Sequence, residues 1–138
     1  MEYRFIIRFR LLLVLMSSFT SFSCGYFDND KIEYQKRVAQ NITIQKQEND
    51  NSNNLVFEET NNVSAVILNN CFKIYYDSLD KKIYVETSQN KVDKDYWQIK
   101  ILNSSAQYVF EAIQKEVITK EVFDEKTKNV LMKWEVNK

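Results

Sequence analysis

Short runs in which apolar and polar residues alternate recur through the second half of the chain, and they restrict its fold more than any other feature. The runs are Phe72–Tyr76, Ile83–Glu86, Trp97–Ile101 and Val130–Val136. Successive side chains of a strand point to opposite faces, so each run predicts a strand with one buried face. With the apolar stretches LVFEE and VSAVIL, these runs predict six to eight short strands.

The turns between these strands have to be made almost without glycine. The chain has one glycine, Gly25, and no proline in 138 residues. Asn and Asp must therefore carry the tight turns that follow. Residues 76–85 and 123–132 share a pattern of aromatic residue, Asp, polar residues and three apolar residues. We interpret both as hairpins, in which Asp77 and Asp124 hold the turns through hydrogen bonds to backbone amides.

These patterns predict a mainly β fold for residues 55–138, a small antiparallel meander that closes as a sandwich or in a barrel-like form. Residues 106–120 stay open between two interpretations. A strand is favoured by the alternation of Tyr108, Phe110 and Ala112, and a helix by the spacing of Val109, Ile113 and Val117.

The segment before this β domain, residues 24–54, predicts a short helix between two polar stretches. Residues 25–31 have the composition of an exposed tether. Over residues 30–44 a modest helix is expected, with Asn29 or Asp30 as N-cap. The positions that fall near one helical face are Ile32, Gln35, Val38, Ala39 and Ile42. A partly disordered stalk is the alternative. Residues 45–54 lack any apolar side chain and predict a linker, because such a run buries too little surface to offset its ordering entropy.

The first 23 residues have the layout of an exported leader. A segment with three arginines precedes the apolar block Leu11–Met16, and small polar residues then lead to Cys24. A transmembrane helix needs about 20 mostly apolar residues. Extending the block backwards would place Arg8 and Arg10 inside the bilayer, at a cost of a few kcal/mol each. A leader over residues 1–23 that is removed is therefore the favoured interpretation.

The residues Ser21-Phe22-Ser23-Cys24 resemble the cleavage box of bacterial lipoproteins. Ser23 matches the small residue of that box, whereas Ser21 stands where leucine is usual, a relaxed form similar to the boxes of spirochaete lipoproteins. The resemblance covers about the first thirty residues. It implies that Cys24 carries acyl chains and begins the mature protein, which would be anchored to a membrane by lipid. Gly25 in place of an aspartate implies, by the same resemblance, the outer membrane.

The alternative for Cys24 is a disulfide with Cys71, since export permits one. If Cys24 is lipidated, Cys71 is the leftover thiol, and a small buried hydrophobic side chain is expected there.

The chain lacks the residues that most catalytic and metal sites require. Histidine is absent, which removes the commonest general base, the usual triads and most zinc sites. Asp93-Lys94-Asp95 resembles the start of a calcium loop without its later glycine and glutamate. Two carboxylate sets, Glu58-Glu59 and Asp77/Asp80, could pair as acid and base, but no spacing brings them together. We therefore expect no enzyme, no cofactor and no metal.

The charge balance argues against nucleic-acid binding. Basic and acidic residues number 19 each in the whole chain, and 16 and 18 after residue 23. A nucleic-acid-binding protein needs a basic face, which this balance does not supply.

The aromatic residues suggest what the β domain does. Tyr75, Tyr84, Tyr96 and Tyr108 are expected opposite the apolar faces of their strands, either as a binding surface, or as cover for the second face of a sheet, or as the filling of a barrel. The sequence thus predicts a non-enzymatic, lipid-anchored interaction module at the outer membrane, with an unidentified protein partner. The alternatives are a periplasm-facing accessory subunit of an envelope complex and a small barrel that binds an apolar ligand.

Overall fold

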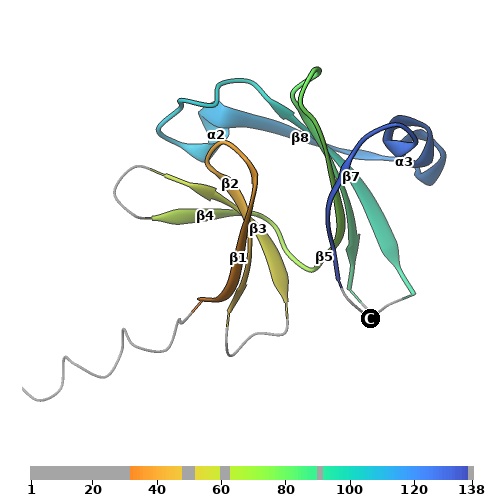
Figure 1. Ribbon diagram of the computed structural model, residues 1–138, viewed down its shortest axis with the longest axis horizontal. Helices are drawn as coiled ribbons and strands as arrows, with labels where there is room; N and C mark the ends of the chain where they lie inside the picture. The colour runs from red at the N-terminus through yellow and green to blue at the C-terminus, as the bar shows by residue number, and fades with distance from the viewer. Residues whose placement is uncertain (1–31, 48–51, 60–62, 90–91, 137–138) are drawn as a thin grey trace, which may run out of the picture. The chain divides into compact units, whose positions relative to one another are not determined.

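A computed structural model describes residues 32–47, 52–59, 63–89 and 92–136 (Figure 1). The compact unit begins at Ile32, and its described part is mainly β, as the alternation predicts. Its strands form two antiparallel sheets, one of four strands and one of five, rather than one closed barrel. The leader, Cys24, the tether and the proposed cap residues Asn29 and Asp30 lie outside the described residues.

The four-stranded sheet is an up-and-down meander in the order β1-β2-β3-β4. Its strands are β1 (Ile32–Ala39), β2 (Ile42–Gln47), β3 (Asn53–Glu58) and β4 (Ser64–Leu68). Ile42, Ile44, Leu55 and Phe57 alternate toward the core and are almost fully buried. The first half of the predicted β domain is therefore longer than expected, because it begins before Leu55.

The helix predicted over residues 30–44 is wrong, because β1 and β2 form a hairpin there. Its turn is at Gln40 and Asn41, and Asn41 has a φ of 58° that no helix interior adopts. The residues on either side of this turn include Val38, Ile42 and Ile44, whose branched side chains favour strands. Pairing with β3 and burial in the core override the weak helical spacing.

The linker predicted over residues 45–54 is also wrong at both of its ends. β2 runs to Gln47 and β3 begins at Asn53, with Gln45 opposite Asn54 in the register. Gln45 and Asn54 are both buried. The pairing of Ile44 with Leu55 fixes the register of β2 and β3, and the hydrogen-bonded ladder continues from there through Gln45 and Asn54. The polar composition of this segment does not reveal such a continuation.

The five-stranded sheet has the order β8-β7-β6-β5-β9. Its strands are β5 (Cys71–Asp77), β6 (Lys82–Ser88), β7 (Lys94–Ile101), β8 (Ile113–Ile118) and β9 (Met132–Glu135). Because β8 and β9 lie at opposite edges, the chain between them has to cross one face of the sheet. This crossing contains helix α3 (Lys120–Thr127), and we call the face it covers the outer face.

The two segments with a shared pattern fold differently. Residues 76–85 form the predicted hairpin turn, in which Asp77 Oδ1 accepts hydrogen bonds from the amides of Leu79 and Asp80 at 3.0 and 3.2 Å. The second hairpin is wrong, because Phe123 and Asp124 lie in α3. Thr119 caps the start of that helix, and Asp124 pairs with Lys120 one turn earlier.

Residues 106–120 contain both of the structures that the sequence left open. Helix α2 (Val109–Ala112) is a single turn, and β8 follows it directly. Positive φ angles occur at Asn41, Asn70 and Lys81 among the described residues, so asparagine takes the place of glycine at two of these three turn positions.

One hydrophobic core is shared by the two sheets. It joins Ile44 and Leu55 of the first sheet to Ile74, Ile83 and Ile99 of the second. Trp97 and Trp134 pack against it while partly exposed. The face of the five-stranded sheet that carries these isoleucines is its core face, against which Tyr76 also packs. Tyr75, Tyr84 and Tyr96 lie on the outer face.

Candidate interaction surface

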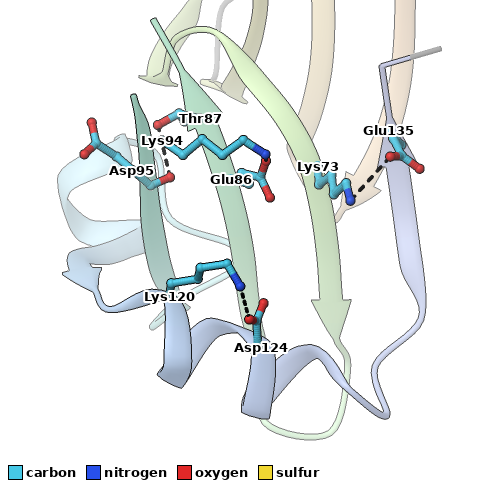
Figure 2. Close-up of polar contacts among 8 residues, drawn as sticks. All are labelled: Lys73, Glu86, Thr87, Lys94, Asp95, Lys120, Asp124 and Glu135. Carbon is cyan, nitrogen blue, oxygen red and sulfur yellow. Dashed lines mark hydrogen bonds and ion pairs between the residues drawn. The ribbon is translucent and has the colours of Figure 1, made fainter. Parts of the chain in front are cut away.

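Charged side chains of alternating sign cross the outer face of the five-stranded sheet (Figure 2). Lys73 Nζ of β5 lies 3.5 Å from Glu135 Oε1 of β9. Lys94 Nζ of β7 lies 2.6 Å from Glu86 Oε1 of β6, and the register places Lys73 opposite Glu86. These four residues, the charge ladder, pair with one another and join four strands of the sheet.

Glu86 is the buried member of the charge ladder, with only 5% of its surface exposed. A buried carboxylate requires a partner, and the hydrogen bond from Lys94 supplies it. The same hydrogen bond raises the pKa of Lys94 above its ordinary value. Lys94 Nζ also lies 5.3 Å from the centroid of the Phe72 ring. These contacts give Glu86 and Lys94 a role in holding the sheet together.

Helix α3 covers most of the predicted tyrosine surface. Phe123 of this helix is 3% exposed and packs edge-on against Tyr75, with ring centroids 5.8 Å apart. Its ring also lies 5.0 Å from that of Tyr96. Tyr84 stands opposite Tyr75 in the register and is itself buried. Tyr75, Tyr84 and Tyr96 therefore cover the second face of the sheet, the alternative that the sequence left open.

Tyr108, the fourth predicted tyrosine, is exposed and lies outside the strands. It immediately precedes α2 and stacks on Phe110, with centroids 5.6 Å apart and planes 8° from parallel. The exposed fractions are 44% for Tyr108 and 74% for Phe110. Large exposed aromatic rings offer contact area at a low entropy cost, which makes this stack a candidate for recognition.

Two further exposed apolar residues, Val63 and Leu102, lie on backbone segments that are connected to α2 by hydrogen bonds. Glu59 links Val63 to α2, because its amide donates to Val63 O at 2.8 Å and its Oε1 accepts from the amide of Val109 at 3.2 Å. The amide of Leu102 donates to Ala112 O at 2.8 Å. Val63 and Leu102 are 56% and 54% exposed. We call Val63, Leu102, Tyr108 and Phe110 the distal patch.

The distal patch lies near the end of β1 that is remote from Ile32. The turn after β1 contacts the loop before α2, since Asn41 Nδ2 donates to Ser104 O at 3.1 Å. The same turn contacts β3, since the amide of Glu58 donates to Asn41 O at 2.8 Å. In Figure 1 the β1–β2 turn accordingly lies beside α2, whereas β1 starts at the other end of its sheet.

Burial determines the chemistry of two titratable groups. Cys71 is a free thiol, 2% exposed, and burial raises its pKa to about 12. Its Sγ lies 3.6 Å from Leu68 O. The expectation of a small buried side chain at Cys71 is confirmed. Burial, with the nearby Asp77 and Asp80 carboxylates, also raises the pKa of Tyr84.

The four carboxylates considered as an acid–base pair have structural partners. Glu58 Oε1 accepts a hydrogen bond from Gln35 at 2.6 Å, Glu59 binds the α2 amide, and Asp77 holds its turn. Asp80 lies 3.9 Å from Lys82, and Asp93 and Asp95 are exposed. Within the described ranges, no group of three or more metal-ligating side chains comes together.

Sequence reasoning missed three of the four residues in the distal patch. The sequence indicates Tyr108 as a candidate, whereas Val63 falls in the predicted strand VSAVIL, Phe110 falls in the stretch left open between strand and helix, and Leu102 falls in no predicted element. The alternation of Tyr108 and Phe110 did place both rings on one side of the chain. What the alternation could not show was that Tyr108 and Phe110 lie at a single helical turn instead of on a strand.

Comparisons with known proteins do not relate this chain to others. No protein-family model, no curated protein and no solved structure matches it. In the part of the chain that the structure describes, no helix is long and apolar enough to cross a bilayer.

Proposed function

We propose that this protein is a lipid-anchored, non-enzymatic interaction module of the cell envelope, held at the outer membrane by acyl chains on Cys24. The observation that carries the proposal is the exposed aromatic stack of Tyr108 and Phe110 at the end of β1 remote from Ile32. An exposed apolar surface of this kind commonly contacts a partner protein.

The distal patch and the proposed anchor are connected to opposite ends of β1. Residues 25–31 span at most about 25 Å when fully extended, so an acylated Cys24 would hold Ile32 close to the bilayer. A strand of eight residues then extends roughly 26 Å farther. The distal patch therefore lies at the opposite end of β1 from Ile32, the residue that follows the proposed tether.

Lipid anchoring is tested by replacing the acylated sulfur. Cys24→Ser should abolish incorporation of labelled fatty acid and move the protein from the membrane to the soluble fraction, because no other acyl acceptor is proposed. Cys71→Ala is the matched control and should keep both the label and the membrane location, since that thiol is buried. Undiminished labelling of Cys24→Ser would refute the anchor.

Partner binding is tested with a photo-crosslinking residue at Phe110 in living cells. One defined cross-linked product is expected, and it should be absent when the same residue replaces Leu79. Leu79 is the matched control because it is 93% exposed in the turn between β5 and β6. The same products from both positions would contradict a specific surface. Protease treatment of intact cells then separates display on the cell surface from a periplasm-facing accessory role.

A further inference from the structure

The four edge strands of the two sheets differ in how they are protected against pairing with another chain. β1 carries Lys36 and Arg37, β8 carries Lys115 and Glu116, and β9 carries Lys133 and Glu135. β4 has the sequence SAVIL and carries no charge. Charged residues on an edge strand oppose pairing between sheets, so β4 is the least protected edge among the described strands.

The hydrogen-bonding groups that β4 leaves open follow from its register. The amide of Glu59 donates to Val63 O, which makes this opposed pair a hydrogen-bonded one. Hydrogen-bonded pairs alternate along an antiparallel ladder, so Ala65 bonds to Phe57, whereas the amides and carbonyls of Ser64 and Val66 point away from β3. Both of these residues are exposed, and Val66 is 54% exposed.

The open stretch of β4 ends at Ile67. A register shift between Val66 and Leu68 leaves Ile67 without a direct partner on β3. The carbonyl of Ile67 instead accepts a hydrogen bond from Lys115 Nζ of β8 at 3.0 Å. Lys115 thus covers the second half of the edge, and Ser64–Val66 is the segment available to another strand.

We infer that Ser64–Val66 pairs antiparallel with the same segment of a second copy of this chain. A two-fold axis at Ala65 would place Ser64 of each copy opposite Val66 of the other. The amides and carbonyls that Ser64 and Val66 direct away from β3 would then all be hydrogen-bonded to the other copy. The self-complementary hydrogen-bonding pattern favours a second copy here, because Ser64 and Val66 of one copy pair with Val66 and Ser64 of the other without any charged side chain in the contact. On the other three edges self-pairing brings charged residues against an identical charged strand, whereas β4 meets only neutral side chains.

The pairing is short, so it predicts a reversible, concentration-dependent dimer. Val66, on the face of β4 that points away from the core, would lose exposed apolar surface in the contact. The inference does not require Cys24 to be acylated, nor the distal patch to bind a partner, and it can fail or hold independently of the proposed function.

Disulfide cross-linking of the full-length chain tests this geometry. Ala65 of one copy would lie directly opposite Ala65 of the other in a non-hydrogen-bonded pair, with Cα atoms about 4.5 Å apart, a separation that a disulfide spans. Ala65→Cys should convert most of the protein on oxidation from 16.5 kDa to twice that mass on a non-reducing gel. Gln114→Cys, exposed on the charged edge β8, is the matched control and should cross-link no more than the unchanged sequence.

A charge placed on the edge provides the second measurement. Val66→Lys combined with Ala65→Cys should lose the cross-linked dimer, because each copy would bring one positively charged lysine into the same short strand pairing. Val117→Lys is the control, since Val117 is 63% exposed on β8, and it should leave the dimer yield unchanged. Equal cross-linking of Ala65→Cys and Gln114→Cys, an undiminished yield with Val66→Lys, or a product joined to a different protein would each overturn the inference.

Discussion

At the scale of single residues, the same side chain acquires different roles from its position in the fold. Asp77 and Asp124 occupy equivalent places in the two similar segments. Asp77 follows a strand and accepts two turn amides, whereas Asp124 lies in α3 and pairs with Lys120. The difference comes from Thr119, whose Oγ1 accepts from the amide of Val122 at 3.4 Å and starts a helix before the pattern can form a turn.

Cys71 gives a prediction at this scale. The thiol of the folded protein should be unreactive toward a thiol reagent at pH 8 and should react only on unfolding, because burial raises its pKa to about 12 from 9.0. A pKa raised in the folded state contributes stability that is complete below pH 9 and is lost as the pH rises toward 12. The free energy of unfolding should fall by about 4 kcal/mol in all between pH 9 and pH 12 from this one group.

The measurement is urea unfolding between pH 8 and 11, with Cys71→Ala as the reference. The variant should be less stable at pH 8 but should lose stability less steeply above pH 9. Some alkaline loss should remain in both proteins, since the pKa values of Tyr84 and Lys94 are raised as well. Identical pH dependence of the two proteins would contradict the assignment.

At the scale of elements, α3 forms part of the connection that the chain makes between opposite edges of the five-stranded sheet. The helix is mostly exposed and highly charged, and it buries only Phe123 and Thr127. Phe123 contacts Tyr75 of β5 and Tyr96 of β7 and so spans the middle of the outer face. One aromatic side chain therefore anchors α3 on the sheet.

Phe123→Ala should destabilise the protein by roughly 3–5 kcal/mol, the usual cost of removing a buried phenylalanine side chain. The loss should be accompanied by faster amide exchange in α3 and by exposure of the tyrosine rings beneath it. Urea unfolding measures the loss of stability, hydrogen exchange measures the opening of α3, and tyrosine absorbance measures the exposure of the rings. Val122→Ala, a 38% exposed position on the same helix, should cost much less. Similar costs for the two substitutions would show that Phe123 is not the anchor.

At the scale of the whole molecule, the residues before Leu55 are part of the β fold. β1 and β2 contribute Val38, Ala39, Ile42 and Ile44 to the shared core. Without these strands, β3 would become an edge and the core face of the five-stranded sheet would lose part of its cover. The two sheets therefore stabilise one another through one core.

A chain that begins at Ile32 should fold, whereas one that begins at Leu55 should not. The shorter chain lacks four buried core residues, which small folds of this size cannot replace. Far-ultraviolet circular dichroism and thermal melting distinguish the two, with a cooperative transition expected only for the longer chain. A cooperative melt of the chain starting at Leu55 would show that the five-stranded sheet is independently stable.

The sequence by itself determined the local features of this protein: the strands with strict alternation, the turn at Asp77, the burial of Cys71 and asparagine at two tight turns. These depend on the period of the side chains and on the conformations of individual residues. The tertiary structure decided the β hairpin of residues 32–47 in place of the helix predicted over residues 30–44, the helix at Phe123 and the outward position of Phe110. The hairpin depends on the pairing of β2 with β3. Helix α3 combines the local Thr119 cap with the packing of Phe123 on Tyr75 and Tyr96 of strands distant in sequence. Local patterns that fit two structures equally well cannot choose between them.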